Sequence, residues 1–181
     1  LKVPEQQQAL AIHTPEAEWT CMGIESKYII CTNQSITYLV HYKHALTKIY
    51  FERIKANQQR EQTHTQQLLF PETIDLSLQQ TEVLKAYMEH LKKIGFEIEN
   101  FGGTTFIIHG IPVLSSEISA VQLLEETLQK SIDDVDTNLK DATLQIAFSL
   151  AQSIANKKQF PSTHDELKSI VEQLLQCPAA H

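Results

Sequence analysis

The chain is poor in glycine and in cations, and both shortages limit what it can bind. It has 5 glycines in 181 residues, and neither G-x-G-x-x-G nor G-x-x-x-x-G-K-[ST] occurs. The loops that cradle nucleotide phosphates are therefore not indicated. Lys and Arg number 15 against 22 Asp and Glu, a formal net charge of −7. We expect weak or no DNA binding by this chain alone, because binding a phosphate backbone requires a surplus of cations.

Cysteines and long apolar runs are also scarce. Cys21, Cys31 and Cys177 are an odd number with wide spacing, which predicts reduced thiols rather than a disulfide framework. No apolar run approaches the roughly 18–20 residues that span a bilayer. The chain starts at Leu1, without a Met or the apolar core of a signal peptide, so it looks like a piece excised from a longer protein. We therefore predict a cytoplasmic location and no membrane contact.

An apolar share of 42% is enough for a folded core, and its spacing predicts the elements. Residues 1–18 contain three consecutive glutamines and two prolines, which predicts a linker remnant. Runs of β-branched and aromatic residues predict extended segments at 27–31, 35–40, 66–71, 96–99 and 104–108. Helical spacing and capping boxes predict helices at about 43–60, from Ser77 to Gly95, and at 116–131, 138–157 and 163–176. The predicted class is α+β with antiparallel strands.

Four strings occur in an order that carries a family resemblance. They are YFERI at 50–54, QLLFPET at 67–73, FEIENFGGTTF at 96–106 and GIP at 110–112. Each string alone is weakly specific, but together and in register they resemble the C-terminal domain of the DNA mismatch repair protein MutL. The resemblance covers about 21–177 and is strongest to the forms of Bacteroidetes-type bacteria that lack the endonuclease motif.

The resemblance implies a two-lobed fold and a homodimer. A discontinuous dimerisation lobe would comprise 19–65 plus 143–181, and 66–142 would be inserted as an external, regulatory lobe. The family's ATPase is a separate N-terminal domain, so this domain would need no cofactor and would hold two ATPase arms in one molecule. Other mismatch repair proteins would dock on the external lobe. An unrelated dimeric scaffold that only resembles the family stays open as an alternative.

Many members of this family carry a metal-dependent nicking site, D-Q-H-A-x-x-E-x-x-x-x-E, at the start of the first helix. Aligned without gaps, its Asp, His, first Glu and last Glu positions fall on His41, Lys43, Thr47 and Glu52. One ligand of four is retained, and the ammonium of Lys43 has no lone pair for a metal. The family's later cysteine position falls on Leu150, and no C-P-x-G-[RK]-P string is found. The resemblance therefore implies neither a catalytic residue nor a metal here.

The local histidines leave a second interpretation open. His41 and His44 are three residues apart and Glu52 follows two turns on, so they form a candidate zinc site, with Cys177 or His181 as a further ligand. Such a site would make the protein a metal-dependent endonuclease with a rebuilt ligand set. Against it, spacing alone rarely makes a site. The alternative is a set of surface polar residues at a helix start, one of them an N-cap.

Gln66, Leu69 and Pro71 have the Q-x-x-[LI]-x-P spacing of a sliding-clamp-binding peptide, and family members carry such a motif at this position. An extended peptide offers its glutamine for hydrogen bonds and its apolar side chains, here including Phe70, for a pocket on the clamp. The alternative is that Leu68, Leu69 and Phe70 form a buried strand linking the lobes. Exposure of Leu69 and Phe70 would favour the clamp, and burial would favour the strand.

Overall fold

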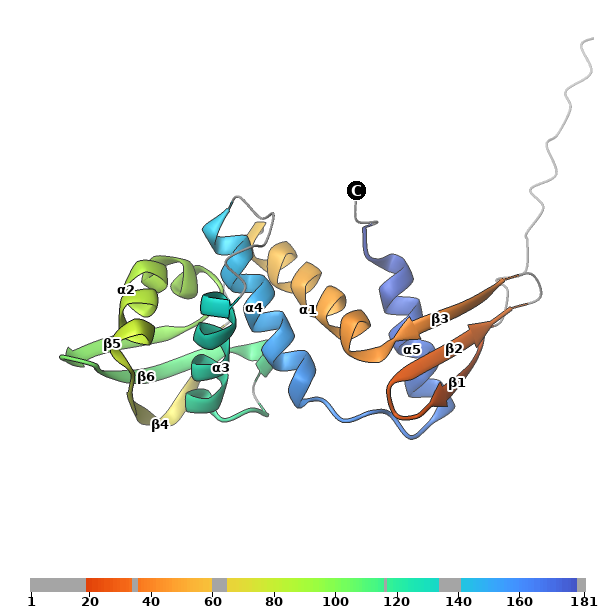
Figure 1. Ribbon diagram of the computed structural model, residues 1–181, viewed down its shortest axis with the longest axis horizontal. Coiled ribbons are helices and arrows are strands. Elements are labelled where there is room, and N and C mark those ends of the chain that lie inside the picture. The colour runs from red at the N-terminus through yellow and green to blue at the C-terminus, as the bar shows by residue number, and fades with distance from the viewer. Residues whose placement is uncertain (1–18, 34–35, 60–64, 116, 134–140, 179–181) are drawn as a thin grey trace, which may run out of the picture.

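The computed structural model describes residues 19–33, 36–59, 65–115, 117–133 and 141–178. Two three-stranded antiparallel sheets lie at opposite ends of an elongated molecule, and helices lie between and beside them (Figure 1). The predicted α+β class with antiparallel strands is confirmed. The linker predicted for 1–18 lies outside the described residues.

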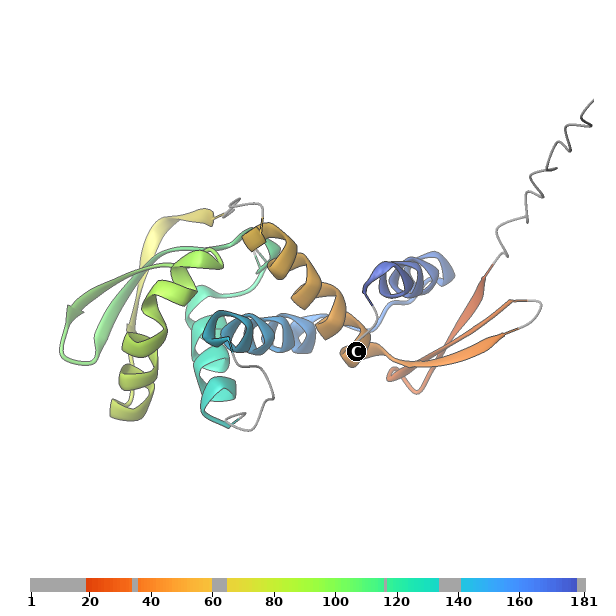
Figure 2. The ribbon, with the colours of Figure 1, turned by 90° about the horizontal axis from the view of Figure 1, so that it is seen from above.

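The first sheet contains the predicted hairpin and one strand that was not predicted. Its order is β1-β2-β3, with strands at Thr20–Ile24, Tyr28–Thr32 and Thr37–His41. β2 and β3 lie within a residue or two of their predicted positions. One face of the sheet is covered by α5 (His164–Gln176), whose buried Leu167 and Val171 pack in the same cluster as Ile29 (Figure 2). The capping box predicted at Thr163 and Glu166 begins this helix.

Cys21 and Cys31 face each other across β1 and β2, and their sulfurs form a disulfide. The prediction of reduced thiols is therefore wrong for this pair, and only Cys177 is free. Spacing along the sequence does not show the bond, because it depends on the pairing of β1, which brings the two Cα atoms to 4.2 Å. The disulfide also removes the support that reduced thiols would lend to a cytoplasmic location.

Reduction of this disulfide is expected to destabilise the chain by about 2–3 kcal/mol, because the bond closes a short loop in the unfolded state. The measurement is urea unfolding with and without dithiothreitol. A Cys21→Ala/Cys31→Ala variant should lose the dithiothreitol effect, whereas the Cys177→Ser control should keep it. A wild-type midpoint that dithiothreitol does not move, at full thiol titration, would contradict the expectation.

The first sheet is joined to the rest of the molecule through α1 (Tyr42–Gln59). The buried Tyr42 packs edge-on against Phe160, with ring centroids 5.0 Å apart, and its hydroxyl donates to the Gln159 carbonyl. Burial raises the pKa of Tyr42 to about 12. A side chain at Gly23 would approach the Phe160 ring to 2.6 Å, so the absence of a Cβ lets this ring lie against β1.

The second sheet has the order β4-β6-β5. Its elements and those beside it are β4 (Thr65–Asp75), α2 (Leu78–Lys93), β5 (Glu97–Gly102), β6 (Thr105–Pro112), η1 (Val113–Ser115) and α3 (Ala120–Asp133). The capping box at Ser77 and Gln80 is present, and Gly95 after α2 has a φ of 106°, where glycine is favoured. β4 is longer than the predicted extended segment because it continues past Pro71.

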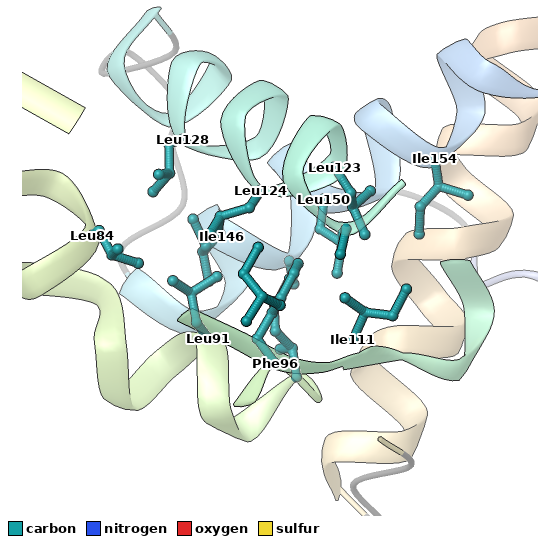
Figure 3. Close-up of a cluster of buried hydrophobic side chains, with 14 of the residues drawn as sticks. Leu84, Leu91, Phe96, Ile111, Leu123, Leu124, Leu128, Ile146, Leu150 and Ile154 are labelled. Atoms are coloured by element: carbon teal, nitrogen blue, oxygen red, sulfur yellow. The ribbon is translucent and has the colours of Figure 1, made fainter. Parts of the chain in front are cut away.

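α4 (Ala142–Lys157) lies between the two sheets and contacts α1, α2 and α3. Its buried residues take up most of the helix circumference, and Phe148, Gln152 and Asn156 lie on the remaining, less buried face. Ile146, Leu150 and Ile154 join the main hydrophobic cluster together with side chains of the second sheet and of α1, α2 and α3 (Figure 3). The hydroxyls of Ser149 and Ser153 donate to carbonyls four residues earlier, so these buried groups are paired.

None of the described helices is long and apolar enough to cross a bilayer.

Candidate functional site

The face of the first sheet that points away from α5 carries a row of apolar side chains. Met22 pairs with Ile30, which pairs with Leu39, so the three side chains lie side by side across β1, β2 and β3. Met22 is 60% and Leu39 66% exposed. Figure 2 shows α5 on one side of this sheet and no described helix against the other side. A row of exposed large apolar side chains on one sheet face is typical of a protein interface.

Sequence reasoning missed this row because it did not predict β1. Its sequence, Thr20 to Ile24, does not alternate apolar with polar residues and contains Gly23, so it carries only a weak strand signal. The buried members of β1 and β2 pack in one cluster with residues of α5, and Met22 and Ile30, at alternate positions, point away from it.

The predicted clamp motif lies where β4 leaves its partner strand. Gln67 pairs with Gly110 and Glu72 with Ile108, so four residues of β4 lie opposite one residue of β6. Within this bulge Leu68 packs against the main core, whereas Leu69 is 94% and Phe70 83% exposed. The alternative of a buried connecting strand therefore fails for Leu69 and Phe70.

Both ends of the bulge are held by the sheet. On one side the Gln67 amide donates to the Glu97 carboxylate at 2.7 Å. At Gly110 an added Cβ would lie 2.5 Å from the Thr65 side chain, so glycine permits the close approach of β4 there. Pro71 needs no ladder partner because it has no N–H to donate. Gln66 is exposed and pairs with Ile111 just before the bulge. The motif thus includes an exposed apolar bulge whose flanking residues pair with β6.

Lys43, at the position of the nuclease motif's histidine, donates its side-chain hydrogen bonds to backbone carbonyls. Its ammonium donates to the carbonyls of Ala155 at 2.9 Å and Asn156 at 3.2 Å, and to that of Lys158. These are carbonyls at the C-terminal end of α4, which attracts a cation. Burial lowers the pKa of Lys43. The residue joins the start of α1 to the end of α4.

The other motif positions make contacts of their own. The Thr47 hydroxyl donates to the Lys43 carbonyl at 2.9 Å. Glu52 forms ion pairs with Lys48 at 2.8 Å and Lys55 at 3.8 Å. Three of the four positions, His41, Lys43 and Thr47, line one cavity, and Glu52 is not among the residues that line it.

The candidate zinc ligands are brought together only in part. The rings of His41 and His44 stack with centroids 4.0 Å apart, and His41 Nδ1 accepts from the His44 N–H at 3.4 Å, as an N-cap does. Burial, followed by the charges of His44 and Lys27, lowers the pKa of His41. Among the described residues no group of three or more His, Cys, Asp or Glu side chains is placed to hold a metal. His181 lies outside them.

Lys43→Met is expected to destabilise the chain by about 1–2 kcal/mol, because three carbonyls of α4 lose a charged donor. Lys48→Met, on the same helix, is the matched control and should cost less than about 0.5 kcal/mol, since it removes one i,i+4 ion pair. Urea unfolding of both variants gives the comparison. Equal effects of the two substitutions would contradict the anchoring role of Lys43.

Comparison with known protein families identifies one match over most of the chain. A family model described as the MutL C-terminal dimerisation domain matches residues 21–176. Apart from Thr20, the matched range includes both sheets and every described α-helix, so the similarity extends over nearly all of the described fold.

Individual relatives carry the name DNA mismatch repair protein MutL. The protein of Geobacter sulfurreducens is 30% identical over 146 residues, which cover 80% of this chain and 24% of that protein. The protein of Bacteroides fragilis is 27% identical over 161 residues, 87% of this chain and 25% of its own length. That of Parabacteroides distasonis is 24% identical over 157 residues, 87% of this chain and 26% of its own. The chain spans about a quarter of these relatives.

Proposed function

The chain belongs to the MutL C-terminal dimerisation domain family, and we propose that it joins two copies of a mismatch repair protein into a homodimer. The observation that carries the proposal is the uncovered apolar row of Met22, Ile30 and Leu39. A two-fold axis near this row would place each copy's side chains against the same side chains of the other copy. Both rows would then leave water, which is the main driving force for association.

The proposed dimer is tested by size-exclusion chromatography with light scattering. We expect a mass of twice the chain mass of 20.6 kDa at micromolar concentration. A stable interface of this kind buries at least about 1,000 Å², so the dimer should persist on dilution. A monomer at micromolar concentration would refute the proposal.

We propose that the two ends of the molecule are separate lobes with different functions. The dimerisation lobe comprises 19–65 plus 143–181, and 66–142 form the inserted external lobe, with the first and second sheets in separate lobes. Support comes from the separate hydrophobic cluster beneath the first sheet. α4 is shared, since its side chains also complete the core of the second sheet. In this arrangement the external lobe is available to other mismatch repair proteins.

We propose that the external lobe presents Gln66, Leu69, Phe70 and Pro71 to a DNA sliding clamp. The support is the exposure of Leu69 and Phe70 in a bulge whose ends are held by β6. Apolar side chains that are exposed in the free protein and fixed in position lose little conformational entropy on binding. A pocket on the clamp would cover them.

We propose that the domain is not a nuclease and needs neither a metal nor a cofactor. This proposal is supported by the contacts at the motif positions. The Lys43 ammonium donates to backbone carbonyls, and the Glu52 carboxylate pairs with Lys48, so these positions do not form a set of metal ligands. Incubation with supercoiled plasmid and manganese should leave the plasmid intact. Nicking that disappears in Glu52→Ala would favour the alternative, an endonuclease with a rebuilt ligand set.

Since the relatives named above are DNA repair proteins, we also propose a cytoplasmic location.

A further inference from the structure

A cavity lies between α1 and α4 and reaches the C-terminal end of α3. Its volume is about 730 Å³, within the range of pockets that hold small molecules. The side chains that line it come from the end of β3, from α1, from one face of α4 and from Lys130 of α3. None of the proposed roles in dimerisation or clamp binding uses this cavity.

The charge of the cavity is opposite to that of the chain. Its walls include three lysines (Lys43, Lys48 and Lys130) and the stacked pair His41 and His44, and no Asp or Glu is among the described residues that line it. The whole chain carries −7. Contact with α4 carbonyls fixes Lys43 without neutralising it, and the partner of Lys48, Glu52, is not one of the lining residues. A cationic cavity with low-dielectric walls raises the local concentration of anions.

The rest of the lining is aromatic and amide in character. Phe51 and Phe148 meet edge to face with ring centroids 5.7 Å apart. Gln152 and Asn156 follow Phe148 on α4 at four-residue intervals, so they lie on the same face of the helix, and both line the cavity. Aromatic rings suit the flat face of a base, and amides can both donate to and accept from its edge.

We propose that this cavity binds a nucleoside monophosphate, with the phosphate at the lysines and the base at the Phe51 and Phe148 wall. Inorganic phosphate is too small to fill the cavity, and it cannot contact the lysines, the phenylalanine rings and the side-chain amides at the same time. A long DNA strand would bring many phosphates against a chain of net charge −7, whereas a mononucleotide brings one. The ligand is therefore a free mononucleotide.

The test is calorimetric titration of the whole chain with dAMP. Deoxyadenosine, which lacks the phosphate, and inorganic phosphate, which lacks the nucleoside, are titrated separately for comparison. We expect a dissociation constant at or below about 1 mM for dAMP and weaker binding of both deoxyadenosine and inorganic phosphate. Lys130→Met should weaken dAMP roughly fivefold, and Lys48→Met/Lys130→Met more than tenfold. Lys85→Met, an exposed lysine of α2 outside the cavity, is the matched control and should leave the affinity unchanged.

Three results would overturn the proposal. The first is the absence of dAMP binding in a sample that is folded and dimeric. The second is an equal loss in Lys85→Met and Lys130→Met, which would indicate attraction to the general surface. The third is a single-stranded oligonucleotide that binds more tightly per site than dAMP, which would assign the cavity to a strand. Circular dichroism confirms that each variant is folded before its titration.

Discussion

Leu39→Asp is expected to convert the dimer into monomers and to raise the dimer dissociation constant by at least roughly 100-fold. The side chain is 66% exposed in the single chain, so the substitution leaves the fold intact. In the proposed dimer each copy would bury one carboxylate against the apolar row of the other copy. An unpaired buried charge costs several kcal/mol. Light scattering over a dilution series measures the change.

Phe101→Asp is the matched control for this experiment. Phe101 is also a large apolar residue, and it is exposed on β5 of the second sheet. This sheet lies at the other end of the molecule from the row of Met22, Ile30 and Leu39 (Figure 1). This variant should remain a dimer, which separates a specific interface from a general effect of added charge. If Leu39→Asp stays a dimer while it is folded, the interface lies elsewhere on the molecule.

Leu69→Ala/Phe70→Ala is expected to weaken binding to the organism's sliding clamp by roughly 100-fold or more. Two exposed apolar anchors that fill a pocket are typical binding hot spots, each worth about 2 kcal/mol or more. Gln66→Ala should weaken binding by about tenfold, since one polar contact is lost. Surface plasmon resonance with immobilised clamp gives the dissociation constants.

The control for the clamp experiment is Leu78→Ala/Phe101→Ala. Both residues are large, apolar and exposed on the same end of the molecule, outside the bulge. This variant should bind the clamp as the wild type does, and both double variants should keep the wild-type unfolding midpoint. Unchanged clamp binding by Leu69→Ala/Phe70→Ala would show that the motif is not used.

Local signals predicted most of the fold. The capping boxes at Ser77 and Thr163 depend on residues three apart, and both helices begin where these boxes predict. The predictions that failed depend on contacts between residues that are separated in the sequence, or on the register of the strands. Cys21 meets Cys31 only through the pairing of β1 with β2, and a short strand that contains a glycine gives a weak propensity signal.

The same distinction applies to the candidate sites. The spacing of Gln66, Leu69 and Pro71 is a local pattern, but the exposure of Leu69 depends on a register shift against β6 that no sequence pattern predicts. Sequence reasoning noted that Lys43 cannot ligate a metal. That its ammonium instead binds the end of α4 depends on a contact between residues more than a hundred positions apart.

The shared helix α4 has a consequence for how two docking loops in one dimer act together. Because α4 packs against α1 on one side and against α2 and α3 on the other, the lobes cannot turn independently without breaking one core. In the proposed dimer the two β4 bulges, one in each copy, would therefore lie at a fixed distance from each other. A partner with two binding sites at the matching distance gains avidity through effective concentration, and a partner with any other spacing gains none.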